Sequence, residues 1–258
     1  MNATEELPRG QQLLLQRLIA NHCVSNKEAE RIFKSLLGKD YIDENEDEGN
    51  NGNEDHQVGI MGPGIDTLEA AFVSINRQLK PGFGLEIVTL VDTTGSGNAK
   101  YHHAVVNTTA DEIAKKETVF SKSWNPHERA FVRLVMRTLV DQNDDDDDDD
   151  NDEEDDDDED NSNKKKASVI SIRRADLINL RSDLEGGFKL TLDQATRVIG
   201  ILLEEKWLRT SALTDDNRRE SVQAKIELAP RSYMELSHYI MGLGLAAEKL
   251  PQFVFHRD

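Results

Sequence analysis

The stretch LTLDQATRVIGILLEEKWLRTSAL, residues 190–213, decides the fold. Its first part carries apolar residues at helical spacing, and Thr191 and Gln194 form a capping pair that places the start of the helix. Directly after the helix, KWLRT at 206–210 has the composition of a short strand led by Trp207. A helix followed at once by such a strand predicts a helical core closed by a β-ribbon, with the tryptophan anchored in that core. The predicted buried face of the helix is Ala195, Val198, Ile199, Leu202 and Leu203.

The residues on either side of this stretch complete a structural unit. A helix is expected to start at Asn125, with the asparagine as its cap, a proline at the first helical position and Glu128 at the third. A second helix is expected from about Ser171 to the glycine pair at 186–187. A polar loop after the tryptophan strand leads to a second strand at 223–228. The predicted order is three helices and then two strands.

Three helices are also expected near the N-terminus. The first covers 11–23, and the second opens with Ser25 as its cap. The third starts at Asp66, which forms a capping pair with Glu69, and ends at Pro81. The apolar stripes of the first two helices are Leu15, Leu18, Ile19, His22 and Cys23, and then Ala29, Ile32, Phe33, Leu36 and Leu37.

Two β-rich runs follow the third helix, at 85–91 and 101–107, and flank the glycine-rich segment DTTGSGNAK. Two such runs around a glycine-rich turn predict a hairpin. Three helices and a two-stranded ribbon therefore occur twice, which is the winged-helix arrangement, an elaboration of helix-turn-helix. We predict an α+β protein, mainly helical, made of tandem winged-helix domains with disordered acidic insertions.

The predicted domain boundaries follow from this order. The first winged-helix domain covers 8–118 and contains a disordered insertion at 39–64, which is rich in acidic residues, asparagine and glycine. The second covers 124–245 and contains a disordered acidic tract at 141–166. Residues 246–258 are expected to be a tail.

The net charge is concentrated in one segment. Residues 144–160 hold sixteen acidic side chains, and without them the formal charge of −19 becomes −3. A run of like charges this dense repels itself and has no apolar surface to bury, so a solvated spacer is expected. An interaction tail for basic partners such as histones stays open as the alternative.

The single cysteine, Cys23, excludes an intrachain disulfide and a metal site with several thiolates from this chain. It favours a reducing, intracellular location, and Cys23 itself is expected to be a small buried hydrophobe. The sequence has no signal peptide and no run of about 18 apolar residues, so we expect a soluble protein with no membrane partner. The lysines at 164–166 fit a weak nuclear import patch or a solubilising end of the tract.

Residue patterns that suggest chemistry are few. DTTGSGNAK contains G-x-G, but it lacks the Gly-Lys-Ser/Thr ending of a phosphate loop and does not open a helix, so a turn of the ribbon is expected. His102 and His103 are adjacent on a strand, so their side chains point to opposite faces and cannot share a metal. No nucleophile with a matching base and acid is present at a known spacing. The sequence predicts no catalytic, cofactor-binding or metal-ligating residue.

Nucleic-acid binding is the obvious function for a winged helix and needs clustered lysine and arginine. The third helix of the second unit presents a mainly acidic face: Asp193, Gln194, Thr196, Arg197, Glu204 and Glu205. We therefore expect weak or indirect DNA contact and docking against other proteins. A free-standing winged-helix DNA-binding regulator stays open as the alternative, as does an adaptor of a transcription or processing assembly.

Several ordered segments resemble one known family. The segments GQQLLLQRLIANHCVSNKEAERIFKSL, LEAAFVSINRQLKPGFGLEIVTLVD, LTLDQATRVIGILLEEKWL and IELAPRSYMELSHYI are similar to the family of non-structural maintenance of chromosomes element one. The resemblance covers most of the chain, except for the two insertions and the ends. It rests on the order of segments, and no catalytic motif contributes to it.

The resemblance implies a function. It implies a subunit of the structural maintenance of chromosomes five/six complex, acting in DNA repair and recombination in the nucleus. The expected partners are a MAGE-domain subunit (element three) and a kleisin subunit (element four). Members of the family carry a C-terminal zinc-binding RING domain and are RING-type E3 ubiquitin transferases, so a ubiquitin-conjugating enzyme is a partner only where a RING is present.

The sequence departs from the family at this point. A RING needs two zinc ions and eight cysteine or histidine ligands, and this chain has one cysteine, so no zinc ligand is carried over. We expect the RING to be absent here, by truncation or by loss, and this chain to be inactive as a ligase by itself. Its expected role is a non-catalytic scaffold. Candidate partner-binding residues, for which core packing is the competing role, are Leu14, Leu18, Phe33, Trp207 and Tyr233.

Overall fold

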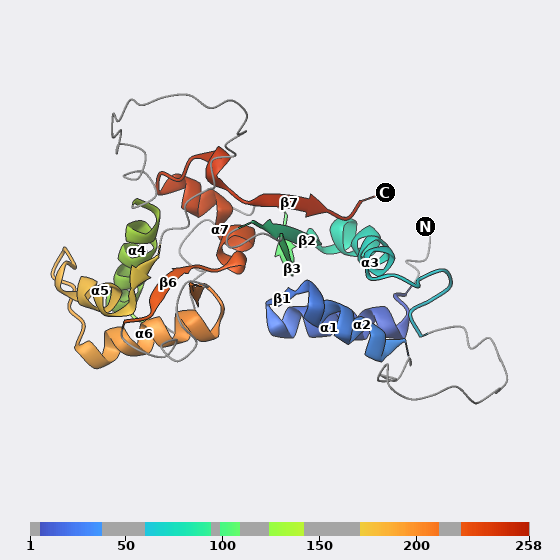
Figure 1. The fold of residues 1–258 in the computed structure, drawn as a ribbon, viewed down its shortest axis with the longest axis horizontal. Coiled ribbons are helices and arrows are strands. Elements are labelled where there is room, and N and C mark those ends of the chain that lie inside the picture. Colours follow the sequence, from blue (N-terminus) through green and yellow to red (C-terminus); the bar gives the residue numbers. More distant parts are fainter. Residues whose placement is uncertain are drawn as a thin grey trace, which may run out of the picture. The chain divides into compact units, whose positions relative to one another are not determined.

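The computed structural model describes residues 6–37, 60–93, 99–108, 124–141, 171–211 and 223–257. It is a mixed structure of helices and small antiparallel sheets, which confirms the α+β class (Figure 1). The chain divides into two compact units. Unit one is built from residues 1–92, 100–110 and 252–258, and unit two from 93–99 and 111–251. The acidic run at 144–160 lies outside the described residues.

The described residues of unit one form three helices beside a four-stranded sheet. The sheet order is β1-β3-β2-β7, and all its neighbours are antiparallel. The elements are α1 (Arg9–Asn21), β1 (Cys23–Ser25), α2 (Asn26–Leu36), α3 (Leu68–Phe83), β2 (Leu85–Asp92), β3 (Lys100–Asn107) and β7 (Gln252–Phe255). The predicted hairpin is confirmed as β2 and β3.

The boundaries of the N-terminal helices differ in part from the sequence prediction. Ser25 caps α2 as predicted, because its hydroxyl accepts from the Glu28 amide. Helix α1 ends before Cys23, because Cys23 pairs with Ala104 of β3 instead of continuing the helix. Its buried face is consequently formed by Leu14 and Leu18, while Ile19, predicted to be buried, is 50% exposed. The burial predicted for Cys23 is confirmed.

Helix α3 also begins and ends later than predicted. Its cap is Thr67, whose hydroxyl accepts from the Ala70 amide, and not Asp66. Pro81 lies inside the last turn, where its missing amide removes a single hydrogen bond. The helix ends at Gly84, which has a φ of 65° in the left-handed region that favours glycine.

The end of the predicted insertion at 39–64 is an ordered part of unit one. Met61 is fully buried in the core, and the side-chain amide of Gln11 donates to its carbonyl at 2.7 Å. Gly10 permits this approach, because a Cβ at that position would lie 2.5 Å from the Met61 sulfur. The described part of the segment from residue 60 onward therefore packs against α1 and is not a free loop.

Unit two has its own helical core and a three-stranded sheet of order β4-β6-β5. The helix predicted from Ser171 is wrong in its extent. A two-residue strand comes first, because Ile172 pairs with Ile226, and the α-helix after it is short. The elements are α4 (Pro126–Asp141), β4 (Ile172–Arg173), α5 (Arg174–Asn179), η2 (Leu180–Ser182), α6 (Leu192–Glu204), β5 (Leu208–Thr210), β6 (Lys225–Leu228), α7 (Pro230–Gly242) and η4 (Ala247–Lys249).

Both units share one order: helix, strand, helix, helix, strand, strand. In each, the strand between the first two helices pairs with the last strand of the ribbon, as β1 with β3 and β4 with β6. The sequence prediction missed these two short strands. The predicted ribbon of unit two is confirmed, since Thr210 lies opposite Ile226 and Leu208 lies opposite Leu228.

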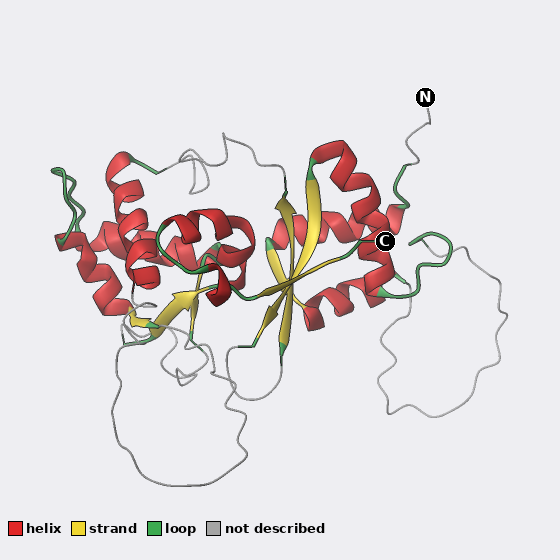
Figure 2. Cartoon of the chain, turned by 90° about the horizontal axis from the view of Figure 1, so that it is seen from above, coloured by secondary structure: helices red, strands yellow, loops and turns green. Residues whose placement is uncertain are grey.

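Residues 246–258 are not a free tail. Strand β7 runs antiparallel to β2, with Phe255 opposite Val88 and Phe253 opposite Leu90, although the two strands are far apart in sequence (Figure 2). Unit two is therefore inserted, in sequence, between the third and fourth strands of the sheet of unit one. The strand was not predicted because its pairing partner is nonlocal.

The end of α6 explains how the helix turns into the tryptophan strand. The Trp207 amide donates to the Leu202 carbonyl at 2.9 Å and the Lys206 amide to the Leu203 carbonyl at 3.1 Å, which is the Schellman pattern of hydrogen bonds. This pattern places Lys206 in the left-handed region, with a φ of 62°. Glycine is the residue that usually occupies this position.

Replacing Lys206 therefore gives a test of this turn. Lys206→Gly relieves the left-handed strain at some cost in backbone entropy, so the free energy of unfolding should rise by about 0.5–1 kcal/mol. Lys206→Val, whose branched side chain tolerates this conformation poorly, should lower it by about 1 kcal/mol. Urea denaturation of both variants checks this, and a stability order with valine above glycine contradicts the Schellman geometry.

Candidate functional site

The structure buries four of the five candidate partner-binding residues. Leu14, Leu18 and Phe33 are at most 4% exposed in the core of unit one, and Trp207 is 2% exposed in the core of unit two. Tyr233 is half-buried and packs against the core of unit two. The five side chains belong to two separate cores and form no common site. Those of the first four pack in the interior and offer almost no surface to a partner.

Helix α7 covers Trp207. The Arg231 guanidinium carbon lies 3.8 Å from the centre of the indole ring, and the Ser232 hydroxyl donates to the Trp207 carbonyl. The indole N–H donates to a Glu205 carboxylate oxygen at 2.9 Å. A buried indole with its N–H satisfied and a cation on its face anchors the strand that follows α6. This role matches the prediction made for Trp207.

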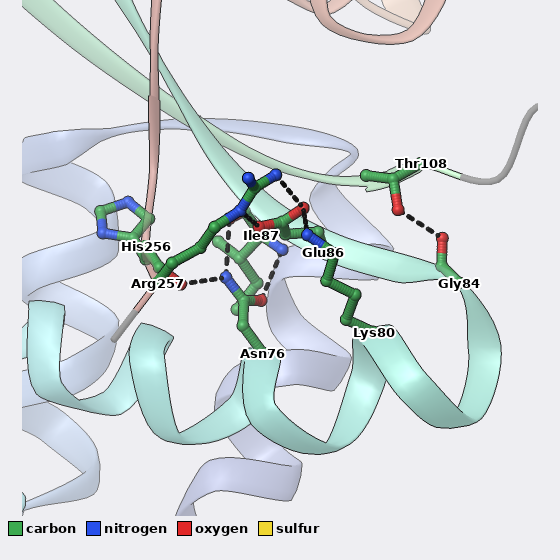
Figure 3. Close-up of polar contacts among 8 residues, drawn as sticks. All are labelled: Asn76, Lys80, Gly84, Glu86, Ile87, Thr108, His256 and Arg257. Atoms are coloured by element: carbon green, nitrogen blue, oxygen red, sulfur yellow. Dashed lines mark hydrogen bonds and ion pairs between the residues drawn. The ribbon is translucent and has the colours of Figure 1, made fainter.

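A cluster of polar side chains lies where β7 docks on β2 (Figure 3). Asn76 of α3 is 5% exposed and holds the backbone of both strands. Its carbonyl oxygen accepts from the Ile87 amide at 2.7 Å, and its amide nitrogen donates to the carbonyls of Ile87 at 3.0 Å and His256 at 3.1 Å. One side chain thus connects the helix, the ribbon and the C-terminal strand. We call Asn76, Glu86, Thr89 and His103 the dock, which receives His256 and Arg257 from the segment after β7.

Glu86 forms the ionic part of the dock. Its fully buried carboxylate accepts from Arg257 at 2.9 and 3.3 Å and lies 3.2 Å from the Lys80 ammonium. Burial alone raises the pKa of Glu86, but the hydrogen bonds and charges of Arg257 and Lys80 outweigh it, so the pKa is lowered. A buried carboxylate needs such partners, and Arg257 comes from the chain just beyond β7.

Thr89 and His103 form the other face of the dock, which holds the His256 ring. Thr89 Oγ1 lies 2.7 Å from His103 Nδ1 and 2.6 Å from His256 Nε2, and His103 Nε2 lies 2.9 Å from the side-chain oxygen of Asn26. The asparagine oxygen only accepts, so neutral His103 carries its proton on Nε2 and accepts from the threonine hydroxyl through Nδ1. His256 must then donate through Nε2 to the Thr89 oxygen. Phe72 contacts both imidazoles, with ring centroids 5.1 Å from each.

The chain of Thr89, His103 and Asn26 has the residue types of a nucleophile, a base and an orienting group. The threonine is only 3% exposed, so its hydroxyl has almost no access to a substrate. Thr89 bonds to the His256 ring, and His103 and Asn26 fix the direction of the threonine hydroxyl. In the described residues, no three histidine, cysteine, aspartate or glutamate side chains are grouped to hold a metal ion.

Among the residues of the dock, only His103 stood out in the sequence. His102 lies on the opposite face of β3, 3.9 Å from an Asp92 carboxylate oxygen, which confirms that the two histidines cannot share a ligand. Glu86 and Thr89 interrupt the apolar run LEIVTLV, and this interruption was the available signal. Asn76, His256 and Arg257 have no signal of their own, because their partners are distant in sequence.

Two comparisons with known proteins match most of this chain. The model of a family described as Nse1 non-SMC component of SMC5-6 complex matches residues 11–236. A solved structure described as an Nse1-Nse3-Nse4 complex is similar in fold, with a TM-score of 0.54 and 16% sequence identity over 92% of this chain and 75% of that chain. No curated protein matches the chain. No helix in the described segments is long and apolar enough to cross a membrane.

The dock predicts a pH dependence of stability. Burial lowers the pKa of His103 from 6.5 to about 4, and the charges of His256 and His102 act in the same direction. The folded state therefore binds fewer protons than the unfolded state. His103 contributes stability that is complete above pH 6.5 and is lost as the pH falls toward 4, in total about 3 kcal/mol.

His103→Gln isolates this contribution, because glutamine does not titrate. Wild type should exceed the variant in free energy of unfolding at pH 7.5, and this difference should shrink by about 3 kcal/mol at pH 4. Urea denaturation at both pH values measures it. An unchanged difference would show that His103 titrates normally in the folded state.

The buried hydrogen bonds of Asn76 should also contribute to the free energy of unfolding. Asn76→Ala leaves the buried Ile87 amide and carbonyl without this partner, so the free energy of unfolding should fall by about 3 kcal/mol. The matched control is Asn179→Ala at an exposed position of α5, with an expected change within about 0.5 kcal/mol. Equal effects of the two substitutions in urea denaturation would exclude Asn76 as a structural anchor.

Proposed function

Because the chain belongs to the Nse1 family of non-SMC components of the SMC5-6 complex, we propose that it is a non-catalytic scaffold subunit that docks to a MAGE-domain subunit of the Nse3 kind and to a kleisin subunit of the Nse4 kind. The family match at 11–236 carries this proposal, since it includes most of both units. The similar solved structure is a complex of Nse1 with Nse3 and Nse4, which supports these two partners.

We propose further that each unit is a winged-helix domain. The shared order of helix, strand, helix, helix, strand, strand supports this assignment, and so does the pairing of the short strand between the first two helices with the last strand of the ribbon. On this assignment α3 and α6 are the third helices, the elements that a DNA-binding winged helix would insert into a groove.

The surface of α6 favours protein docking over DNA binding. Its exposed residues include Asp193, Glu204 and one cation, Arg197. The Arg197 guanidinium is in an ion pair with the buried carboxylate of Glu128, so it is not available to a phosphate. Phosphate binding needs several clustered cations. A free-standing DNA-binding regulator therefore stays the second candidate.

The proposed role lies in DNA repair and recombination in the nucleus, the setting that membership in an SMC5-6 complex family supports. The residues of this chain do not fit the zinc sites of a RING. Its one cysteine, Cys23, is buried in β1, and the described residues hold no cluster of metal ligands.

Co-purification tests the proposed docking. The full chain, mixed with a MAGE-domain subunit and a kleisin subunit of the same complex, should elute with them as one species in size-exclusion chromatography at about 150 mM salt. A control chain whose acidic run at 144–160 is replaced by glycine and serine should elute in the same way, because docking is assigned to the folded units. Separate elution of the wild-type chain contradicts the proposal.

The same preparation also tests the DNA-binding candidate. Binding of the chain alone to a labelled DNA duplex is measured by fluorescence anisotropy while the salt concentration is raised. Tight binding with a steep loss of affinity on added salt favours the regulator, since each neutralised phosphate releases counterions. The scaffold role predicts no tight binding at about 150 mM salt.

A further inference from the structure

Strand β7 contributes little to the core of unit one. The core cluster of unit one consists of residues from α1, α2, α3, the segment around Met61 and strands β1 to β3, and no residue of β7 belongs to it. Two of the four β7 side chains, Val254 and Phe255, are 39% and 47% exposed. No β7 side chain belongs to this core cluster, so the strand is held mainly through its backbone and through the two residues that follow it.

The contacts that hold β7 are those of a docked peptide. Four residues pair with β2 through the backbone. Directly after them, the His256 carbonyl accepts from Asn76, the His256 ring bonds to Thr89, and Arg257 pairs with Glu86. Strand addition to a sheet edge, with affinity from the backbone and specificity from a few side chains, is an established mode of peptide recognition.

An empty dock would leave polar groups in need of a ligand. Glu86 would keep Lys80 as its cation but lose both hydrogen bonds from Arg257, and Asn76 and Thr89 would each lose one partner. The β2 edge would also present unpaired backbone amides and carbonyls. An extended segment with aromatic residues followed by histidine and arginine satisfies all of these groups at once.

We propose that the β2 edge with its dock is a strand-accepting site, which releases its own C-terminal strand and takes residues 252–257 of a second copy of this chain. The second copy is the occupant because its strand offers the same side chains that the dock already holds in the folded chain. Exchange of an identical element between copies needs no new contact. This inference rests on the contacts of β7 and does not depend on the proposed function.

The test uses full-length chains and a labelled, amidated peptide of residues 251–257, with fluorescence anisotropy as the readout. Arg257→Glu weakens the chain's own strand, because it places a second carboxylate beside Glu86, while the dock stays intact. Arg257 is exposed, so this variant should fold, and circular dichroism checks that it does. It should bind the peptide at least tenfold more tightly than wild type, whose site is occupied.

The matched control is Arg209→Glu, which breaks the ion pair of Arg209 with the buried Glu227 in unit two and should leave peptide binding at the wild-type level. A peptide that carries Arg257→Glu itself should bind at least tenfold more weakly. Equal binding of the peptide to wild type and to the Arg257→Glu chain, or equal binding of the two peptides, overturns the strand-accepting site.

A mixing experiment tests the second copy as occupant. The Glu86→Gln chain has a weakened dock and a native strand, and the Arg257→Glu chain has a native dock and a weakened strand. Sedimentation velocity should show monomers for each variant alone and a dimer for the mixture. Peptide binding without dimer formation in the mixture overturns exchange between copies.

Discussion

Backbone pairing between a short strand and a distant ribbon is the constraint on which both units depend. In unit one, Cys23 pairs with Ala104, and in unit two, Ile172 pairs with Ile226. Each short strand lies between two helices, so its pairing fixes where the first helix ends and where the second begins. The leucine-rich helix faces can then close against the sheet, and the last strand of each ribbon finds partners on both sides.

The two units use this plan differently. In unit two, the helix after the ribbon covers Trp207 and stacks Arg231 on its ring, so the last helix completes the core. In unit one, the fourth position of the sheet is filled by β7, which is held by polar side chains at the dock and joins no apolar core. The last element of unit one is therefore held by hydrogen bonds and an ion pair, and that of unit two mainly by apolar burial.

Local chemistry was sufficient to predict much of the fold. The caps at Asn125 and Thr191 were predicted and are present, because a capping box is formed by residues three positions apart. The ribbon around Ile226 and the burial of Trp207 were also predicted. Nonlocal pairings were not predictable in this way. Strands β1, β4 and β7 are too short to show a period, and their partners lie far along the chain.

The residues of the candidate site were likewise not predictable where their contacts are nonlocal. The pattern of β2 and β3 showed polar residues within apolar strands, but nothing near Asn76 or His256 indicated that they would meet. Family membership supplies what the geometry lacks, a place for the chain among the non-SMC components of the SMC5-6 complex. The measurement that tests this account is amide hydrogen exchange of the full chain, free and mixed with the proposed MAGE-domain and kleisin partners. The scaffold account predicts slower exchange in surface segments of both units, and unchanged exchange throughout the chain would contradict it.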